Sequence, residues 1–189
     1  MLISTLSIIF HGDDPASFLD AAHQIKTISP SLFIPGDSEP MALNKPPHET
    51  DALGDDLNGS PNDEDGVQQP FEQISTAQSK YNVKVTVTNP QNSNVYLCGW
   101  IDFNGNGKFE EAEKVSVTGA LSGIQTLTWN NIPSDINGGL SYARFRISTG
   151  QEALQPTGVA PDGEVEDYTI YINGIPQAVP DEVCTHVQI

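Results

Sequence analysis

The sequence predicts an all-β fold, an antiparallel β-sandwich with a jelly-roll-like arrangement of strands. The first observation is that apolar and polar residues alternate in several short segments, as they do in half-buried strands. In the segment Tyr81–Thr88, for example, Tyr81, Val83, Val85 and Val87 fall on one face. The second observation is that 16 glycines and 14 prolines punctuate the 189 residues, which favours turns over long helices. Short strands separated by turns are typical of sandwich domains.

The candidate strands share this alternation or a continuous apolar run, and turn signals such as Asn-Pro and Gly-Gly separate them. In chain order the expected strands are Tyr81–Thr88, Val95–Phe103, Val115–Val117, Ile124–Trp129, Tyr142–Ser148 and Val165–Ile172. No internal repeat with a period of about 20–50 residues is visible, so one module is expected.

The module is expected to span residues 11–172, followed by a C-terminal linker or tail at 173–189. Residues 1–10 are apolar and uncharged, and they fit either an edge strand or the remnant of a leader. They are too short to span a bilayer, and no direct membrane insertion is expected elsewhere in the chain. A short helical turn is expected at Pro15–His23, with Asp14 as its N-cap.

The chain is strongly acidic, with 25 Asp and Glu against 8 Lys and Arg and a formal net charge of -17. This balance argues against binding to nucleic acid or to an anionic membrane, because both need cationic partners. The acids gather in clusters. Residues 51–66 form one cluster, which is either a disordered acidic linker or a cation-binding loop. The candidate ligands in it are Asp55, Asp56, Asp63 and Asp65.

The segment 102–113 matches the calcium-loop pattern D-x-[DN]-x-[DN]-G-x5-E at every specified position. Calcium takes six to eight oxygen ligands at about 2.3–2.6 Å, and alternate residues of a tight loop can turn their oxygens inward. An Asn-Gly hairpin turn is the simpler alternative, but it does not need acids at the first and last positions. The segments before and after the loop are strands, so it resembles an EF-hand loop set between sheet elements. The expected ligands are Asp102, Asn104, Asn106, the Lys108 carbonyl and Glu113.

A second acidic cluster lies at the start of the last expected strand. Its carboxylates repel one another unless a cation or an arginine neutralises them. Two alternatives stay open: a further metal site, or ion pairs in which Arg144 and Arg146 neutralise Glu164 and Glu166. The candidate ligands are Asp162, Glu164, Glu166 and Asp167.

Five motifs together resemble the GEVED domain of secreted bacterial proteins. The motif GEVEDY carries the signature, and the others agree with it in order and spacing. The resemblance covers residues 11–172, with Asp14 standing where alanine is usual and Ser60-Pro61-Asn62 widening one gap. The motifs are GDDPASF at Gly12–Phe18, GDDLNGSPNDEDGV at Gly54–Val67, GWIDFNGNGKFEEAE at Gly99–Glu113, ARFRIS at Ala143–Ser148 and GEVEDY at Gly163–Tyr168.

The resemblance implies a β-rich extracellular module of adhesin-like proteins or of proteins with a secreted hydrolase domain. It also implies calcium (Ca2+) bound by acidic loops. A cell-surface protein or polysaccharide is the expected partner. The resemblance does not imply a catalytic activity. The residues agree on the last point, since no nucleophile and base are grouped as an enzyme would need.

The second functional hypothesis is a carbohydrate-binding module attached to a secreted hydrolase. Trp100, Trp129 and the tyrosines Tyr96 and Tyr142 could line a sugar-binding platform, or they could belong to the core. Exposure of these rings would decide between the two. The two cysteines, Cys98 and Cys184, could form a disulfide or remain as two thiols.

Overall fold

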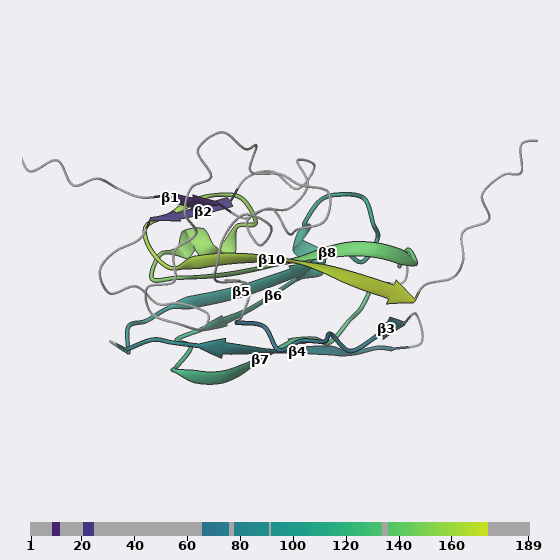
Figure 1. Ribbon diagram of the computed structural model, residues 1–189, viewed down its shortest axis with the longest axis horizontal. Helices are drawn as coiled ribbons and strands as arrows, with labels where there is room; N and C mark the ends of the chain where they lie inside the picture. The colour runs from purple at the N-terminus through teal and green to yellow at the C-terminus, as the bar shows by residue number, and fades with distance from the viewer. Residues whose placement is uncertain are drawn as a thin grey trace, which may run out of the picture.

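A computed structural model describes residues 9–11, 21–24, 66–75, 78–90, 92–133 and 136–173. These residues form strands and short 3-10 turns arranged in three layers (Figure 1). A five-stranded sheet is the central layer, a two-stranded sheet covers one of its faces, and a small three-stranded sheet lies on the other side. The all-β sandwich predicted from the sequence is therefore confirmed.

The central sheet has the strand order β3-β10-β8-β5-β6. Its neighbours pair antiparallel, except that β3 pairs parallel with the end of β10. The strands are β3 (Ile74–Ser75), β5 (Tyr96–Ile101), β6 (Lys114–Thr118), β8 (Gly139–Ser148) and β10 (Glu164–Asn173).

The second sheet consists of β4 (Tyr81–Val87) and β7 (Gly123–Trp129), paired antiparallel. Alternate residues of β4 are buried, from Tyr81 to Val87, as the sequence predicts. The register places Tyr81 directly opposite Trp129. A further bridge between Val67 and Val85 extends this layer beyond β4.

The third layer consists of β1 (Ile9–His11), β2 (Ala21–Gln24) and β9 (Gly158–Ala160). Strand β1 pairs antiparallel with β2, and β2 pairs parallel with β9. Two 3-10 turns complete the described structure: η2 (Glu111–Glu113) precedes β6, and η3 (Gln151–Leu154) precedes β9.

The central sheet has apolar residues on both faces, and they form two cores. The larger core fills the space toward β4 and β7 and includes Leu97, Phe103, Leu127, Trp129 and Phe145. The smaller core lies on the opposite face. It contains Cys98, Trp100 and Phe109, with Tyr142 and Leu154 packed against them.

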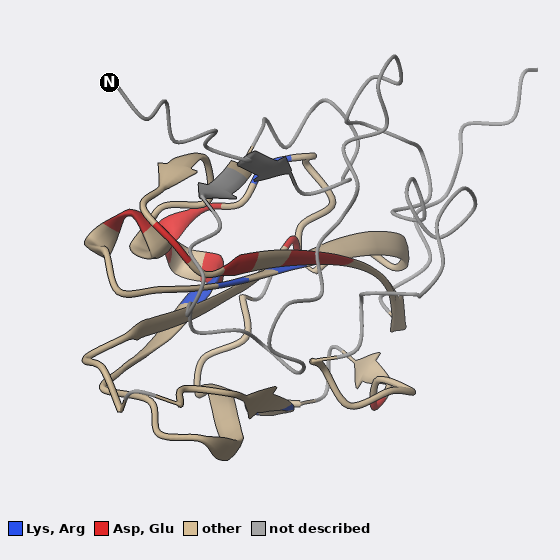
Figure 2. Ribbon diagram, turned by 60° about the vertical axis from the view of Figure 1, so that its left-hand side comes forward, with Lys and Arg blue, Asp and Glu red and all other residues tan. Residues whose placement is uncertain are grey.

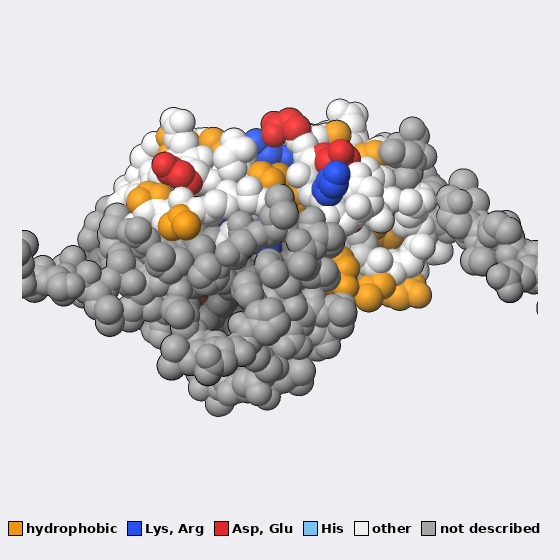
Figure 3. Space-filling view, turned by 90° about the horizontal axis from the view of Figure 1, so that it is seen from above, with side chains coloured by type: hydrophobic (Ala, Val, Ile, Leu, Met, Phe, Trp, Pro, Cys, Tyr) orange, Lys and Arg blue, Asp and Glu red, His pale blue; other side chains and the backbone are white. Residues whose placement is uncertain are grey.

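Both tryptophans are core residues, since Trp100 is 1% exposed and Trp129 is 2% exposed. Tyr96 and Tyr142 are partly buried. The exposed sugar platform considered from the sequence is therefore wrong for the two tryptophans. On the face shown in Figure 3, charged and apolar side chains of the described residues are interspersed.

All six strands expected from the sequence are present, and each bound either coincides with the expected one or differs from it by up to three residues. The helical turn expected at Pro15–His23 is wrong where it can be examined, because residues 21–23 belong to β2. Pairing with β1 and β9 outweighs the helix preference of the Ala-Ala pair there. Of the strand expected in residues 1–10, the last two residues lie in β1, and residues 1–8 fall outside the described part. Within the described ranges, no helix is long and apolar enough to cross a membrane.

Candidate metal centre

The loop 102–113 connects β5 to β6 at one end of the central sheet. It starts where β5 ends, and β8 fixes that starting point through two hydrogen bonds. The Asp102 N–H donates to the Tyr142 carbonyl at 3.0 Å, and the Ser141 hydroxyl donates to the Asp102 carbonyl at 2.5 Å. The backbone of the first expected ligand is thus held by the sheet itself.

The first half of the loop curls around the Asp102 carboxylate. One carboxylate oxygen accepts the Asn106 N–H at 3.1 Å, and the other accepts the Gly107 N–H at 2.9 Å. The Asn106 N–H also donates to the side-chain oxygen of Asn104 at 2.9 Å. Two of the expected oxygen ligands therefore converge on one backbone N–H.

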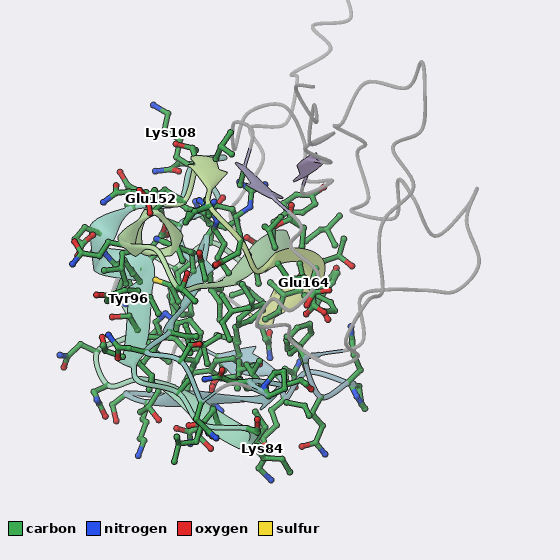
Figure 4. All side chains as sticks on the ribbon, turned by 90° about the vertical axis from the view of Figure 1, so that its left-hand side faces the viewer. Lys84, Tyr96, Lys108, Glu152 and Glu164 are labelled. Carbon is green, nitrogen blue, oxygen red and sulfur yellow. The ribbon has the colours of Figure 1, made fainter. Side chains whose placement is uncertain are left out.

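The amide groups of Asn104 and Asn106 have a defined orientation. Both Nδ2 groups donate to the same carboxylate oxygen of Glu110, at 3.0 and 3.2 Å. Their Oδ1 atoms turn to the other side, where that of Asn106 accepts the Lys108 N–H at 2.9 Å. The Lys108 side chain is exposed and extends away from the molecule (Figure 4). In this orientation the amide nitrogens face Glu110 and the amide oxygens face backbone N–H groups of the loop.

Glu113 closes the loop. One of its carboxylate oxygens accepts the Phe103 N–H at 2.9 Å and the Asn104 N–H at 3.5 Å. The other accepts the Glu110 N–H at 3.1 Å, as part of a capping box at the start of η2. The carboxylate at the twelfth position thus lies against the beginning of the loop, as the calcium-loop pattern requires.

Asp102 and Glu113 are both about 1% exposed, which is unusual for carboxylates. Burial raises the pKa of Asp102, although backbone N–H donors oppose the shift. Burial, together with the negative charge of Asp102, raises the pKa of Glu113 to about 7. No Lys or Arg of the described residues forms a salt bridge with either group. Two neighbouring carboxylates are therefore buried without a positive charge between them.

The donor set fits a hard cation such as calcium. Asp102 and Glu113 would supply carboxylate oxygens, and Asn104 and Asn106 would supply amide oxygens, which are the ligand types that calcium prefers. No group of three or more His, Cys, Asp or Glu that could hold a metal occurs among the described residues, so a site here depends on the amide and backbone oxygens as well. Glu110 was not among the expected ligands. The sequence pattern could have identified Glu110, because it occupies the ninth position of the calcium loop, and this position often contacts calcium through water.

The carboxylates of the second acidic cluster are divided among different partners. Asp162 accepts the Ser148 hydroxyl at 2.8 Å and the Thr149 N–H at 2.7 Å. Asp167 forms a two-point ion pair with Arg144, with both distances at 2.8 Å and both side chains fully buried. Figure 2 shows this part of β10 in red beside the blue part of β8.

The comparison of families agrees with the sequence motifs. Residues 96–171 match the family model of the GEVED domain. This segment of the chain is therefore similar to the GEVED domain family. The match includes β5, the loop 102–113, β8 and most of β10, but it excludes β4 of the second sheet. The wider span of 11–172 stays a prediction.

Two further comparisons add little to the GEVED assignment. No curated protein matches the sequence. The crystal structure of the apo-form Calx CBD1 domain resembles this chain with a TM-score of 0.28 and 11% identity, over 55% of this chain and 90% of that one. A TM-score this low supports no conclusion about this chain.

The residues of the GEVED motif have structural partners in this domain. The Gly66 N–H donates to Glu166 at 3.1 Å, and the Tyr168 hydroxyl donates to the same carboxylate at 3.0 Å. The Val67 N–H in turn donates to the Tyr168 hydroxyl at 3.3 Å. The motif therefore fastens residues 66–67 to β10.

The predicted pairing of Arg144 and Arg146 with Glu164 and Glu166 is wrong. In the register of β8 and β10, Arg144 lies opposite Asp167 and Arg146 lies opposite Val165, on the face away from the two glutamates. Arg146 donates instead to the backbone carbonyls of the segment that leads into β9. Its acceptors are the carbonyls of Gln155 at 2.6 Å, Thr157 at 3.1 Å and Gly158 at 2.8 Å.

The remaining expected ligands, Asp55, Asp56, Asp63 and Asp65, lie outside the described residues, as does Cys184. We also expect from the sequence that Asp63, Glu64 or Asp65 approaches the loop 102–113 or residues 162–167, and this stays a prediction. Gly66, the described residue that follows Asp65 in the sequence, donates its N–H to Glu166. Of the two cysteines, Cys98 is a buried thiol.

Proposed function

We propose that this chain is a non-catalytic, calcium-binding module of an extracellular bacterial protein, with a structural or adhesive role. The observation that carries the proposal is the buried pair Asp102 and Glu113 at the two ends of the loop 102–113. Backbone N–H groups donate to both carboxylates, but burying two negative charges near each other without a positive charge is still costly. A calcium ion between them would remove this cost.

The extracellular assignment is supported by the family and by the chemistry of the site. The motifs of this chain resemble the GEVED domain of secreted bacterial proteins. Calcium loops in extracellular modules bind the ion with a Kd of about 10⁻⁴–10⁻³ M. Such an affinity is useful only where calcium is millimolar, which is the case outside cells. We further propose a cell-surface protein or a polysaccharide as the partner of the module, and the burial of both tryptophans gives the polysaccharide no additional support.

Calorimetric titration of the metal-free protein with calcium tests the proposal. We expect one binding event that Glu113→Gln abolishes or weakens strongly, because glutamine keeps the shape of the side chain and removes its charge. With about 5 mM calcium, a site of this class stabilises the folded state by about 1–2 kcal/mol. A thermal melt should show this stabilisation for the unmodified protein and not for the variant.

Glu111→Gln is the matched control. Glu111 lies in the same 3-10 turn and loses the same charge, but its side chain is 86% exposed and pairs with Lys114 at 2.9 Å. This variant should bind calcium like the unmodified protein. If the unmodified protein binds no calcium, or if both variants lose binding equally, the loop 102–113 is not the site.

A further inference from the structure

Trp129 makes an unexpected contact with the end of the loop 102–113. Its indole N–H donates to the backbone carbonyl of Glu113 at 2.6 Å. The indole is 2% exposed and packs edge-on against Phe103, with ring centroids 6.4 Å apart. Trp129 therefore touches both the second residue of the loop and the last one.

This contact joins two different layers of the fold. Trp129 ends β7 in the two-stranded sheet, whereas the loop starts from β5 in the central sheet. Glu113 is held from both sides: its carboxylate accepts the Phe103 N–H at 2.9 Å, and its carbonyl accepts the indole N–H. The position of the Glu113 backbone therefore depends on how the two sheets pack.

We propose that Trp129 is a positioning residue for the calcium site, acting through Glu113. This inference rests on the proposed function and adds a residue that lies 16 positions beyond the loop pattern. A buried indole N–H needs an acceptor, and the Glu113 carbonyl is the acceptor that the structure provides. The hydrogen bond fixes the backbone of Glu113, so the closing carboxylate reaches the cation without a search through other conformations.

The expected loss of calcium affinity can be judged from other metal sites, in which removing a residue that orients a ligand lowers the affinity by about 10- to 100-fold. Trp129→Phe keeps an aromatic ring in the core and removes the N–H. We expect calcium to bind this variant about tenfold more weakly, with a larger loss for calcium than for magnesium, because the twelfth position supplies two oxygens to calcium. A residue that only fills the core would not change this selectivity.

Tyr81→Phe is the matched control for Trp129→Phe. Tyr81 lies directly opposite Trp129 in the same sheet, with ring centroids 6.2 Å apart. Its hydroxyl donates to the Glu72 carbonyl at 2.8 Å, away from the loop. Each variant loses one hydrogen bond, so both should melt at lower temperatures, but only Trp129→Phe should bind calcium more weakly.

The outcomes separate the two proposals. If the unmodified protein binds calcium and Trp129→Phe binds it with the same affinity and selectivity, the role of Trp129 is disproved and the calcium site stands. If the unmodified protein binds none, the proposed function itself fails.

A second measurement decides the question if Trp129→Phe does not fold. In a Trp100→Phe background, Trp129 is the remaining tryptophan, and the aromatic contact with Phe109 is preserved. Calcium should then change the indole emission with the same Kd that calorimetry gives. An emission that stays constant through saturation would overturn the proposal.

Discussion

At the scale of single residues, several buried polar side chains hold the backbone of neighbouring loops. The guanidinium of Arg146 donates to two carbonyls before β9 and to that of Gly158 at its start, and the Glu166 carboxylate accepts the Gly66 N–H. Burial and the charge of the neighbouring Arg144 lower the pKa of Arg146 to about 10, which leaves it charged at neutral pH. Each of these groups replaces water with backbone partners, which is the condition for burying it.

The ligands of the candidate site differ in how far the sequence predicts them. Asp102 and Glu113 follow from the spacing of one contiguous loop, because local chain geometry sets that pattern. The contact of Trp129 does not follow, since it depends on the packing of β7 against the loop. The partner of Asp167 was missed for a related reason: the register between β8 and β10 decides which arginine lies opposite, and a sequence does not display a register.

Cys98 provides a prediction at the residue scale. Burial raises the pKa of its thiol to about 12, so almost no thiolate exists at pH 8. In a Cys184→Ser variant, which leaves one cysteine, we expect Cys98 to react with a thiol reagent only as fast as the fold opens. Reaction in denaturant should be complete within minutes. Rapid labelling of the native variant at pH 8, with an unchanged melting temperature, would contradict the burial of this thiol.

At the scale of elements, strands with a strong pattern were predictable and short strands were not. The alternation in Tyr81–Thr88 corresponds to β4, in which alternate residues are buried. By contrast, β3 has two residues and β9 has three, which is too short for any periodicity. Strand β2 has the sequence AAHQ, whose local preference is not for a strand. It forms because β1 and β9 offer partners on both sides, which is a tertiary effect.

The start of β10 gives a prediction at this scale. Gly163 has a φ of 96°, and a methyl group on it would overlap the backbone carbonyl of Ile147 in β8. Because that neighbour is backbone, the clash cannot be relieved by turning a side chain. We expect Gly163→Ala to destabilise the fold by about 3 kcal/mol or more, measured by denaturant unfolding.

Gly158→Ala separates the clash from the backbone strain. Gly158 has a φ of 86°, but nothing lies within 4 Å of the position where a methyl group would stand. Only the cost of the left-handed conformation applies there, about 1 kcal/mol. Equal losses for the two variants would show that contact with Ile147 does not decide the need for glycine at the start of the GEVED motif.

At the scale of the whole molecule, the loop 102–113 contacts the central sheet, the second sheet and both cores. Its first residue is held by β8, and its last residue is held by Trp129 of the second sheet. Phe109 enters the smaller core, where its ring lies 6.5 Å from Trp100 and 5.5 Å from the Arg144 guanidinium. Arg144 also donates to the Pro156 carbonyl near the third layer, at 2.8 Å. A change in the conformation of the loop would therefore alter the packing of both cores.

The net charge of -17 leads to the last prediction, because two kinds of repulsion oppose folding and respond differently to salt. Repulsion among exposed acids is screened when NaCl rises from about 20 to about 300 mM, since the Debye length falls from about 20 Å to about 6 Å. Repulsion between the buried groups Asp102 and Glu113 is screened far less. In EDTA, we expect the melting temperature to rise with NaCl. Calcium should raise the melting temperature further at both salt concentrations, because the ion binds between buried carboxylates that NaCl screens poorly.

If 300 mM NaCl abolished the additional effect of calcium, the ion would be acting as a general counterion at the surface. Glu113→Gln should respond to NaCl like the unmodified protein and should lack the additional effect of calcium.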